Sequence, residues 1–92
     1  MPYIKQEDRD KFNGETEHCM YSFIEKVGRK IDTAGEFNFV VTTLAKEYLE
    51  KHGENYQHYN DLLGALEGIK LELYRRQVAP YEDKKIEENG DV

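Results

Sequence analysis

YQHYNDLLGALEGIKLELYRRQVAP, residues 56–80, is the longest uninterrupted helical pattern in the chain. At about 100° per residue, its apolar side chains gather in one broad arc, which is typical of a helix that faces a protein core. The arc consists of Tyr59, Leu62, Leu63, Leu66, Ile69, Leu73 and Tyr74. Asn55 is placed to cap this helix, and Pro80, which has no backbone N–H, predicts its end near Val78. We therefore expect a helix over residues 56–78, against which the other segments pack.

Two features of this helix depart from a simple core helix. Gly64 and Gly68 lie on a flank outside the apolar arc. The missing side chains either admit a close neighbour there or simply cost about 1 kcal/mol each relative to alanine. Lys70 projects into the arc, where an unpaired ammonium is costly to bury. We expect Lys70 to snorkel, to pair with a carboxylate or to meet an anion.

A helix is also expected over residues 15–31, where apolar side chains recur at steps of three and four. The segment ends with Arg29 and Lys30, and positive charge is favourable at the C-terminal end of a helix. The recurring residues are Cys19, Met20, Phe23, Ile24, Val27 and Ile31.

A further helix is expected over residues 34–52. Thr33 and Glu36 have the spacing of a capping box, in which each side chain accepts a hydrogen bond from a free amide of the first turn. Gly53 then supplies a left-handed stop. Residues 37–43 also have strong β-propensity, so a short strand is the competing interpretation, but the cap and the glycine favour a helix.

The two ends of the chain are predicted to be simpler. Residues 1–14 read as an arm with one helical turn at most, whose Tyr3, Ile4 and Phe12 dock on the domain or on a neighbouring subunit. Residues 81–92 read as a charged tail with a short turn or helix near 81–87. The fold class is therefore all-α, with three main helices in a single domain over residues 1–92. A domain this small often gains stability by forming a homo-oligomer, and we expect a dimer or tetramer.

Composition excludes several classes of function. The 92 residues carry a net charge of -6, which opposes non-specific binding to DNA. The single cysteine, the absence of a signal-peptide pattern and the absence of a long apolar run predict a cytoplasmic protein that does not enter a membrane. The histidines His18, His52 and His58 lack metal-ligand spacing, and no nucleophile, acid–base pair or phosphate loop stands out. We predict no catalytic residue, no metal, no cofactor and no enzymatic activity.

One group of side chains suits a planar, anionic ligand. Arginine and lysine hold phosphates, and tyrosine rings stack on bases. The group consists of Lys70, Tyr74, Arg75, Arg76 and Tyr81. A structural role is the alternative, in which these cations neutralise the helix C-terminus and pair with nearby acids or with the tail residues Asp83, Glu87 and Glu88.

The chain resembles a family of short, mostly uncharacterised phage and bacterial proteins. These proteins open with MPYI, have a step like Gly35-Glu36-Phe37-Asn38-Phe39 and a YRR-x3-PYE stretch like Tyr74-Arg75-Arg76 and Pro80-Tyr81-Glu82, and end in NGDV, as at residues 89–92. The stretch from Phe12 to Phe23 departs from that pattern. In size, soluble character and implied phage origin, the family is similar to the anti-CBASS sponge proteins, which sequester cyclic dinucleotide signals without cleaving them.

This resemblance implies a homo-oligomeric sponge that binds a cyclic dinucleotide, such as cyclic GMP-AMP, in pockets between subunits in the host cytoplasm. Lys70, Arg75 and Arg76 would then hold the phosphates, Tyr74, Tyr81 or Tyr3 would contact the bases, and Asn38 would add a polar contact near a helix N-terminus. The alternative is a small protein–protein adaptor or inhibitor with no small-molecule ligand, whose arginines and tyrosines are interface anchors.

Overall fold

A computed structural model describes residues 4–12 and 19–92, and all of the regular structure in these ranges is helical. Its elements are α1 (Gln6–Arg9), the 3-10 helix η1 (Asp10–Phe12), α2 (Met20–Gly28), α3 (Ala34–His52), α4 (Tyr56–Leu73), the π-helical turn η2 (Tyr74–Val78) and α5 (Ala79–Asn89). The all-α prediction is confirmed. Contacts divide the chain into two units, Met1–Thr43 and Leu44–Val92, with the boundary inside α3.

The first unit contains the short N-terminal elements and α2. In the arm, α1 and η1 provide the helical turn that the sequence predicts. The helix expected over residues 15–31 is shorter, because α2 ends at Gly28. The backbone N–H groups of Lys30 and Ile31 bond to the carbonyls of Val27 and Gly28, three residues earlier, so the chain leaves the helix through tight turns. The expected residues 15–18 lie outside the described ranges.

The limits of α3 confirm the predicted helix over residues 34–52 and rule out the competing strand. The backbone N–H of Glu36 donates to the Thr33 hydroxyl at 3.1 Å. The Glu36 carboxylate in turn accepts from the N–H of Asp32 at 2.8 Å, one residue before the position of a standard capping box. At the other end, Gly53 has φ +93°, a left-handed conformation in which a side chain is strained.

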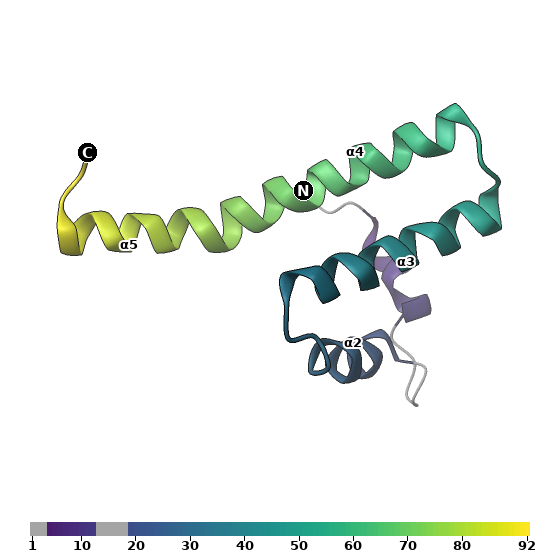
Figure 1. Ribbon diagram of the computed structural model, residues 1–92, viewed down its shortest axis with the longest axis horizontal. Coiled ribbons are helices and arrows are strands. Elements are labelled where there is room, and N and C mark those ends of the chain that lie inside the picture. The colour runs from purple at the N-terminus through teal and green to yellow at the C-terminus, as the bar shows by residue number, and fades with distance from the viewer. Residues whose placement is uncertain (1–3, 13–18) are drawn as a thin grey trace. The chain divides into compact units, whose positions relative to one another are not determined.

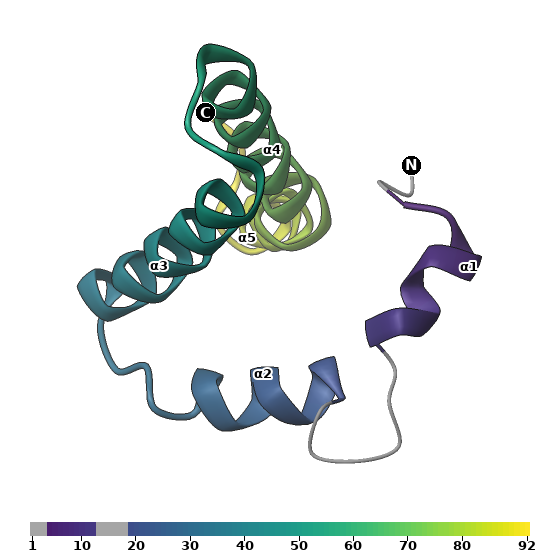
Figure 2. The same ribbon diagram turned by 90° about the vertical axis from the view of Figure 1, so that its right-hand side faces the viewer.

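In the second unit, α4 begins as predicted. The Asn55 side chain accepts from the backbone N–H of His58 at 2.9 Å and so caps the helix. Figure 1 shows α4 running into α5 through η2, and Figure 2 looks along this segment, with α4 in front of α5. Helical backbone therefore extends from residue 56 to residue 89.

The predicted helix end near Val78 is wrong, because helical backbone continues beyond it. The helix expected near residues 81–87 is present but longer, since α5 runs from Ala79 to Asn89. In a regular α-helix the ring of Pro80 would clash with the carbonyl of Arg76. In η2 the N–H of Ala79 instead bonds to the carbonyl of Tyr74, five residues earlier. This wider turn accommodates the proline, which then occupies the first turn of α5, where no donor is needed.

No residue in the described ranges is buried within the chain. The apolar arc of α4 is exposed along its length: Leu63 is 66% exposed, Ile69 58% and Leu73 56%. The helices thus have the amphipathic pattern that the sequence predicts, and their apolar faces are not covered within their own units.

Candidate functional site

The cationic end of the long helix is organised by one carboxylate. Arg75 donates to Glu72 through Nε at 3.1 Å and through Nη2 at 3.0 and 3.1 Å. Arg76 donates through Nε at 2.6 Å to Oε2 of Glu72, an oxygen that Arg75 also contacts. Glu72 lies three and four residues before these arginines, the spacing at which helical side chains meet. Hydrogen bonding to Arg75, reinforced by Arg76 and opposed by desolvation, lowers the pKa of Glu72.

Two guanidinium groups on one carboxylate leave a surplus of one positive charge. Both arginine side chains are 61% exposed, whereas that of Glu72 is 21% exposed. Arg76 contacts Glu72 only through Nε, and a guanidinium carries five N–H donors in all. The cluster can therefore accept a further anion from solvent without losing its internal pairs.

Of the three arrangements expected for Lys70, the structure shows pairing with a carboxylate. Its Nζ lies 3.3 Å from Oε1 of Glu67, one helical turn away, and its side chain is 74% exposed. Such surface pairs contribute roughly 0–1 kcal/mol. The ammonium is therefore easily redirected to another anion.

The two predicted stacking rings on this helix are partly engaged by its own side chains. Hydrogen bonding to Glu82 and the charge of that carboxylate raise the pKa of Tyr74, with smaller contributions from desolvation and Asp83. Nζ of Lys85 lies 5.5 Å from the centre of the Tyr81 ring, a cation–π contact. These contacts link η2 to α5: the Glu82 carboxylate engages the Tyr74 hydroxyl, and the Lys85 ammonium lies over one face of the Tyr81 ring.

The remaining predicted site residues lie in the other unit or outside the described residues. Asn38 belongs to the first unit, where its Oδ1 accepts from the Thr42 hydroxyl at 3.1 Å. Tyr3 lies outside the described residues. Lys70, Tyr74, Arg75, Arg76 and Tyr81 lie on one helical segment, as their positions in the sequence require.

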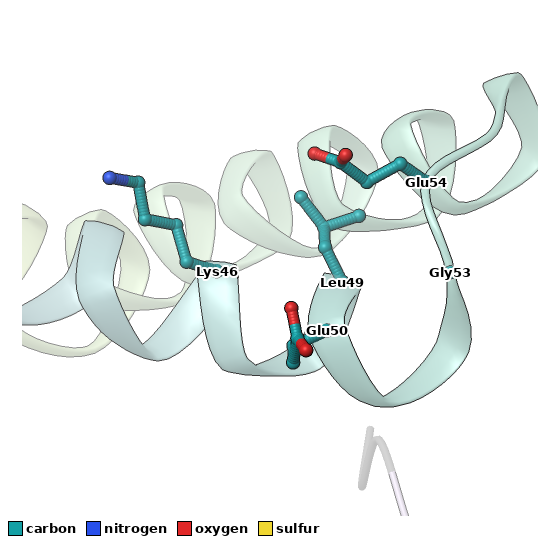
Figure 3. A pocket seen from close by; sticks show the side chains of 5 residues that line it. All are labelled: Lys46, Leu49, Glu50, Gly53 and Glu54. Atoms are coloured by element: carbon teal, nitrogen blue, oxygen red, sulfur yellow. The ribbon is translucent and has the colours of Figure 1, made fainter.

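A hollow lies beside the turn that joins α3 and α4, away from these residues (Figure 3). It has a volume of about 400 Å³ and is lined by Lys46, Leu49, Glu50, Gly53 and Glu54. Two carboxylates against one ammonium give this lining a negative balance, which disfavours a phosphate. The hollow is therefore not the predicted anion site.

A cluster of rings at the same turn was missed by the sequence-based reasoning, which treated the histidines as scattered. The ring centres of Tyr48 and His52 are 4.4 Å apart, and those of His52 and His58 are 5.9 Å apart. Nδ1 of His58 lies 2.7 Å from the carbonyl oxygen of Gly53, to which it donates in the matching tautomer. The four-residue spacing of Tyr48 and His52 was a usable signal, but the place of His58 depends on the turn.

Residues 4–12 and 19–92 were also compared with the requirements of a metal site and of a membrane-spanning helix. No three His, Cys, Asp or Glu side chains in these ranges are arranged to hold a metal ion. No helix in the same ranges is long and apolar enough to cross a membrane.

The fold and the site together define a small, all-α protein with an exposed apolar helix face and a cationic helix end. Residues 1–92 match the family described as "Domain of unknown function (DUF6899)", and the chain belongs to that family. This confirms the expected membership of an uncharacterised family; the description contains no statement about phage origin or ligand. No curated protein and no solved structure matches the chain.

Proposed function

We propose that the protein is a non-enzymatic protein-association module, an adaptor or inhibitor whose helices complete their core against another protein surface. The supporting observation is the exposure of its apolar side chains. No described residue is buried, and rings and aliphatic chains on α2, α3 and α4 are more than half exposed. An amphipathic helix gains most of its stability from covering its apolar face, so these helices need a partner.

The test is the helical content of the chain when it is monomeric. Sedimentation identifies concentrations at which the purified protein is a monomer, and far-UV circular dichroism is recorded there. We expect helicity well below that of the structure, because association stabilises the folded form by mass action. A monomer that is fully helical and unfolds cooperatively would refute the proposal.

A second candidate function is supported by the surplus positive charge around Glu72. In this hypothesis the assembled protein is a sponge, acting in the cytoplasm, that holds a cyclic dinucleotide without cleaving it. Lys70, Arg75 and Arg76 would bind the phosphates. Desolvation in a pocket between subunits strengthens such pairs. The bases would contact Tyr74 or Tyr81, which are 48% and 60% exposed.

A thermal-shift screen against cyclic dinucleotides, ADP-ribose derivatives and mononucleotides tests the sponge. A ligand that binds only the folded form raises the unfolding temperature. We expect Arg76→Ala to abolish the shift without changing the size of the assembly. Glu72→Gln removes the negative charge beside both guanidinium groups, so it should strengthen their attraction for phosphate and increase the shift. No shift at saturating ligand would exclude the sponge and leave the association module.

A further inference from the structure

We infer that the partner covering α4 is a second copy of this chain, which packs through the same helix face. The inference rests on the proposed association function and names its partner. The α4 face is defined here as the exposed apolar stripe that ends at Leu73. It consists of Tyr59, Leu62, Leu63, Leu66, Ile69 and Leu73.

The spacing of the α4 face suits another helix of the same pattern. Tyr59, Leu66 and Leu73 recur every seven residues, and Leu62 and Ile69 form a second series offset by three. This is the pattern of a seam in which each side chain inserts between those of a facing helix. In a twofold dimer the same patch serves both partners, so the chain itself supplies a matching surface.

The area of the face is of the right order for a dimer. Its six side chains are partly to mostly exposed, and fully buried aromatic side chains alone account for about 150–250 Å² each. Five of the six are smaller aliphatic side chains, so at their observed exposure the six together offer roughly a few hundred Å². A standard interface takes about 800 Å² from each partner, so the face supplies the apolar centre and its flanks supply the rim.

The charge around the face also permits two copies to meet. From residue 59 to residue 76 there are three acidic side chains, Asp61, Glu67 and Glu72, and three basic ones, Lys70, Arg75 and Arg76. Their sum is zero, so the net charge of -6 resides in the rest of the chain. Ion pairs within the helix already engage five of these six groups. Two such segments can therefore approach without strong repulsion.

Sedimentation equilibrium and circular dichroism of the purified full-length chain, with no other protein present, test the inference. A helical dimer or larger assembly that loses helicity on dilution is the expected result. A chain that stays monomeric and largely unfolded at all concentrations overturns the second copy as partner but leaves the association module standing. A monomer that stays helical overturns both.

A pair of matched substitutions locates the interface. Leu71 and Leu73 are 59% and 56% exposed and lie about 200° apart around α4, with only Leu73 on the α4 face. Leu73→Gln should raise the dissociation constant at least about tenfold, since a buried leucine contributes about 1.5–3 kcal/mol. Leu71→Gln should leave it within about twofold of the wild-type value. Equal effects of the two substitutions, or no effect of Leu73→Gln, would overturn the assignment of this face. A Leu73→Gln chain too unstable to assemble at any concentration supports it, provided that the Leu71→Gln chain assembles normally.

Discussion

The backbone N–H of Ala79 donates to the carbonyl oxygen of Tyr74, five residues earlier, and this bond marks the π-helical turn η2. It lies directly before Pro80, where a regular α-helix would be interrupted. Because of this turn, the helical backbone continues from α4 into α5 past Pro80 instead of ending there. Glu82, in the first turn of α5, hydrogen-bonds to Tyr74 in η2 and raises the pKa of that phenol.

Moving the proline by one residue should show that the π turn is specific to its position. Pro80→Ala should leave the free energy of unfolding unchanged or raise it by up to about 3 kcal/mol, since alanine restores an N–H donor. The double variant Ala79→Pro/Pro80→Ala has the same composition but removes the bond to Tyr74. It should be less stable than Pro80→Ala by about 3 kcal/mol in urea unfolding at fixed protein concentration. Equal stability of the two variants would contradict this role of the turn.

Replacing either of two glycines by alanine should change the free energy of unfolding, but in opposite directions. Gly53 has φ +93° with open space around it, so Gly53→Ala should lower the free energy of unfolding by about 1–2 kcal/mol through backbone strain alone. Gly64 lies inside α4, with open space where a Cβ would lie, so Gly64→Ala should raise the free energy of unfolding by up to about 1 kcal/mol. Loss of stability in Gly64→Ala would instead show that another chain or a ligand approaches this flank. Urea titration of both variants at the same protein concentration decides between these outcomes.

The cap of α4 can be tested with a pair of asparagines. Asn55→Ala removes the acceptor for the N–H of His58 and should cost about 1 kcal/mol of stability. Asn60 lies inside the same helix, so Asn60→Ala should be neutral or slightly stabilising. Thermal unfolding of both variants gives the comparison. A similar loss in both would mean that the asparagines act through the assembly rather than through helix capping.

The sequence predicted those limits of the helices that depend on local chemistry. A hydroxyl at Thr33, an amide at Asn55 and a left-handed glycine at Gly53 each act on neighbouring backbone, so α3 and the start of α4 were confirmed. The end of α4 was wrong because the rule for Pro80 assumes four-residue hydrogen bonds, and the chain forms one that spans five. No periodicity of side chains carries that information.

The candidate site was predicted only in part, for a similar reason. Arg75 and Arg76 were expected to hold either a ligand or one of many carboxylates. The neighbouring acids and the tail residues Asp83, Glu87 and Glu88 were all candidates. The structure selects Glu72, which the three- and four-residue spacing favours over the tail. The Tyr48, His52 and His58 rings were missed because they meet across a turn of the chain.

The pairing of Glu72 with two arginines should appear in the pH dependence of stability. Because its folded pKa is lowered, its contribution is complete above the unfolded value of about 4.3 and is lost as the pH falls through the lower folded value. The wild type should therefore be more stable than Glu72→Gln at about pH 6, and the difference should shrink as the pH falls below about 4.

Glu47 provides the matched control for this measurement, since it lies on α3 and forms no ion pair within the described residues. Glu47→Gln should show a smaller change with pH than Glu72→Gln, in urea midpoints measured at low salt. Because both guanidinium groups are largely exposed, added salt should reduce the Glu72 difference by screening. A Glu72 difference that persists unchanged in acid and in high salt would show that this carboxylate stabilises the chain by packing rather than by its charge.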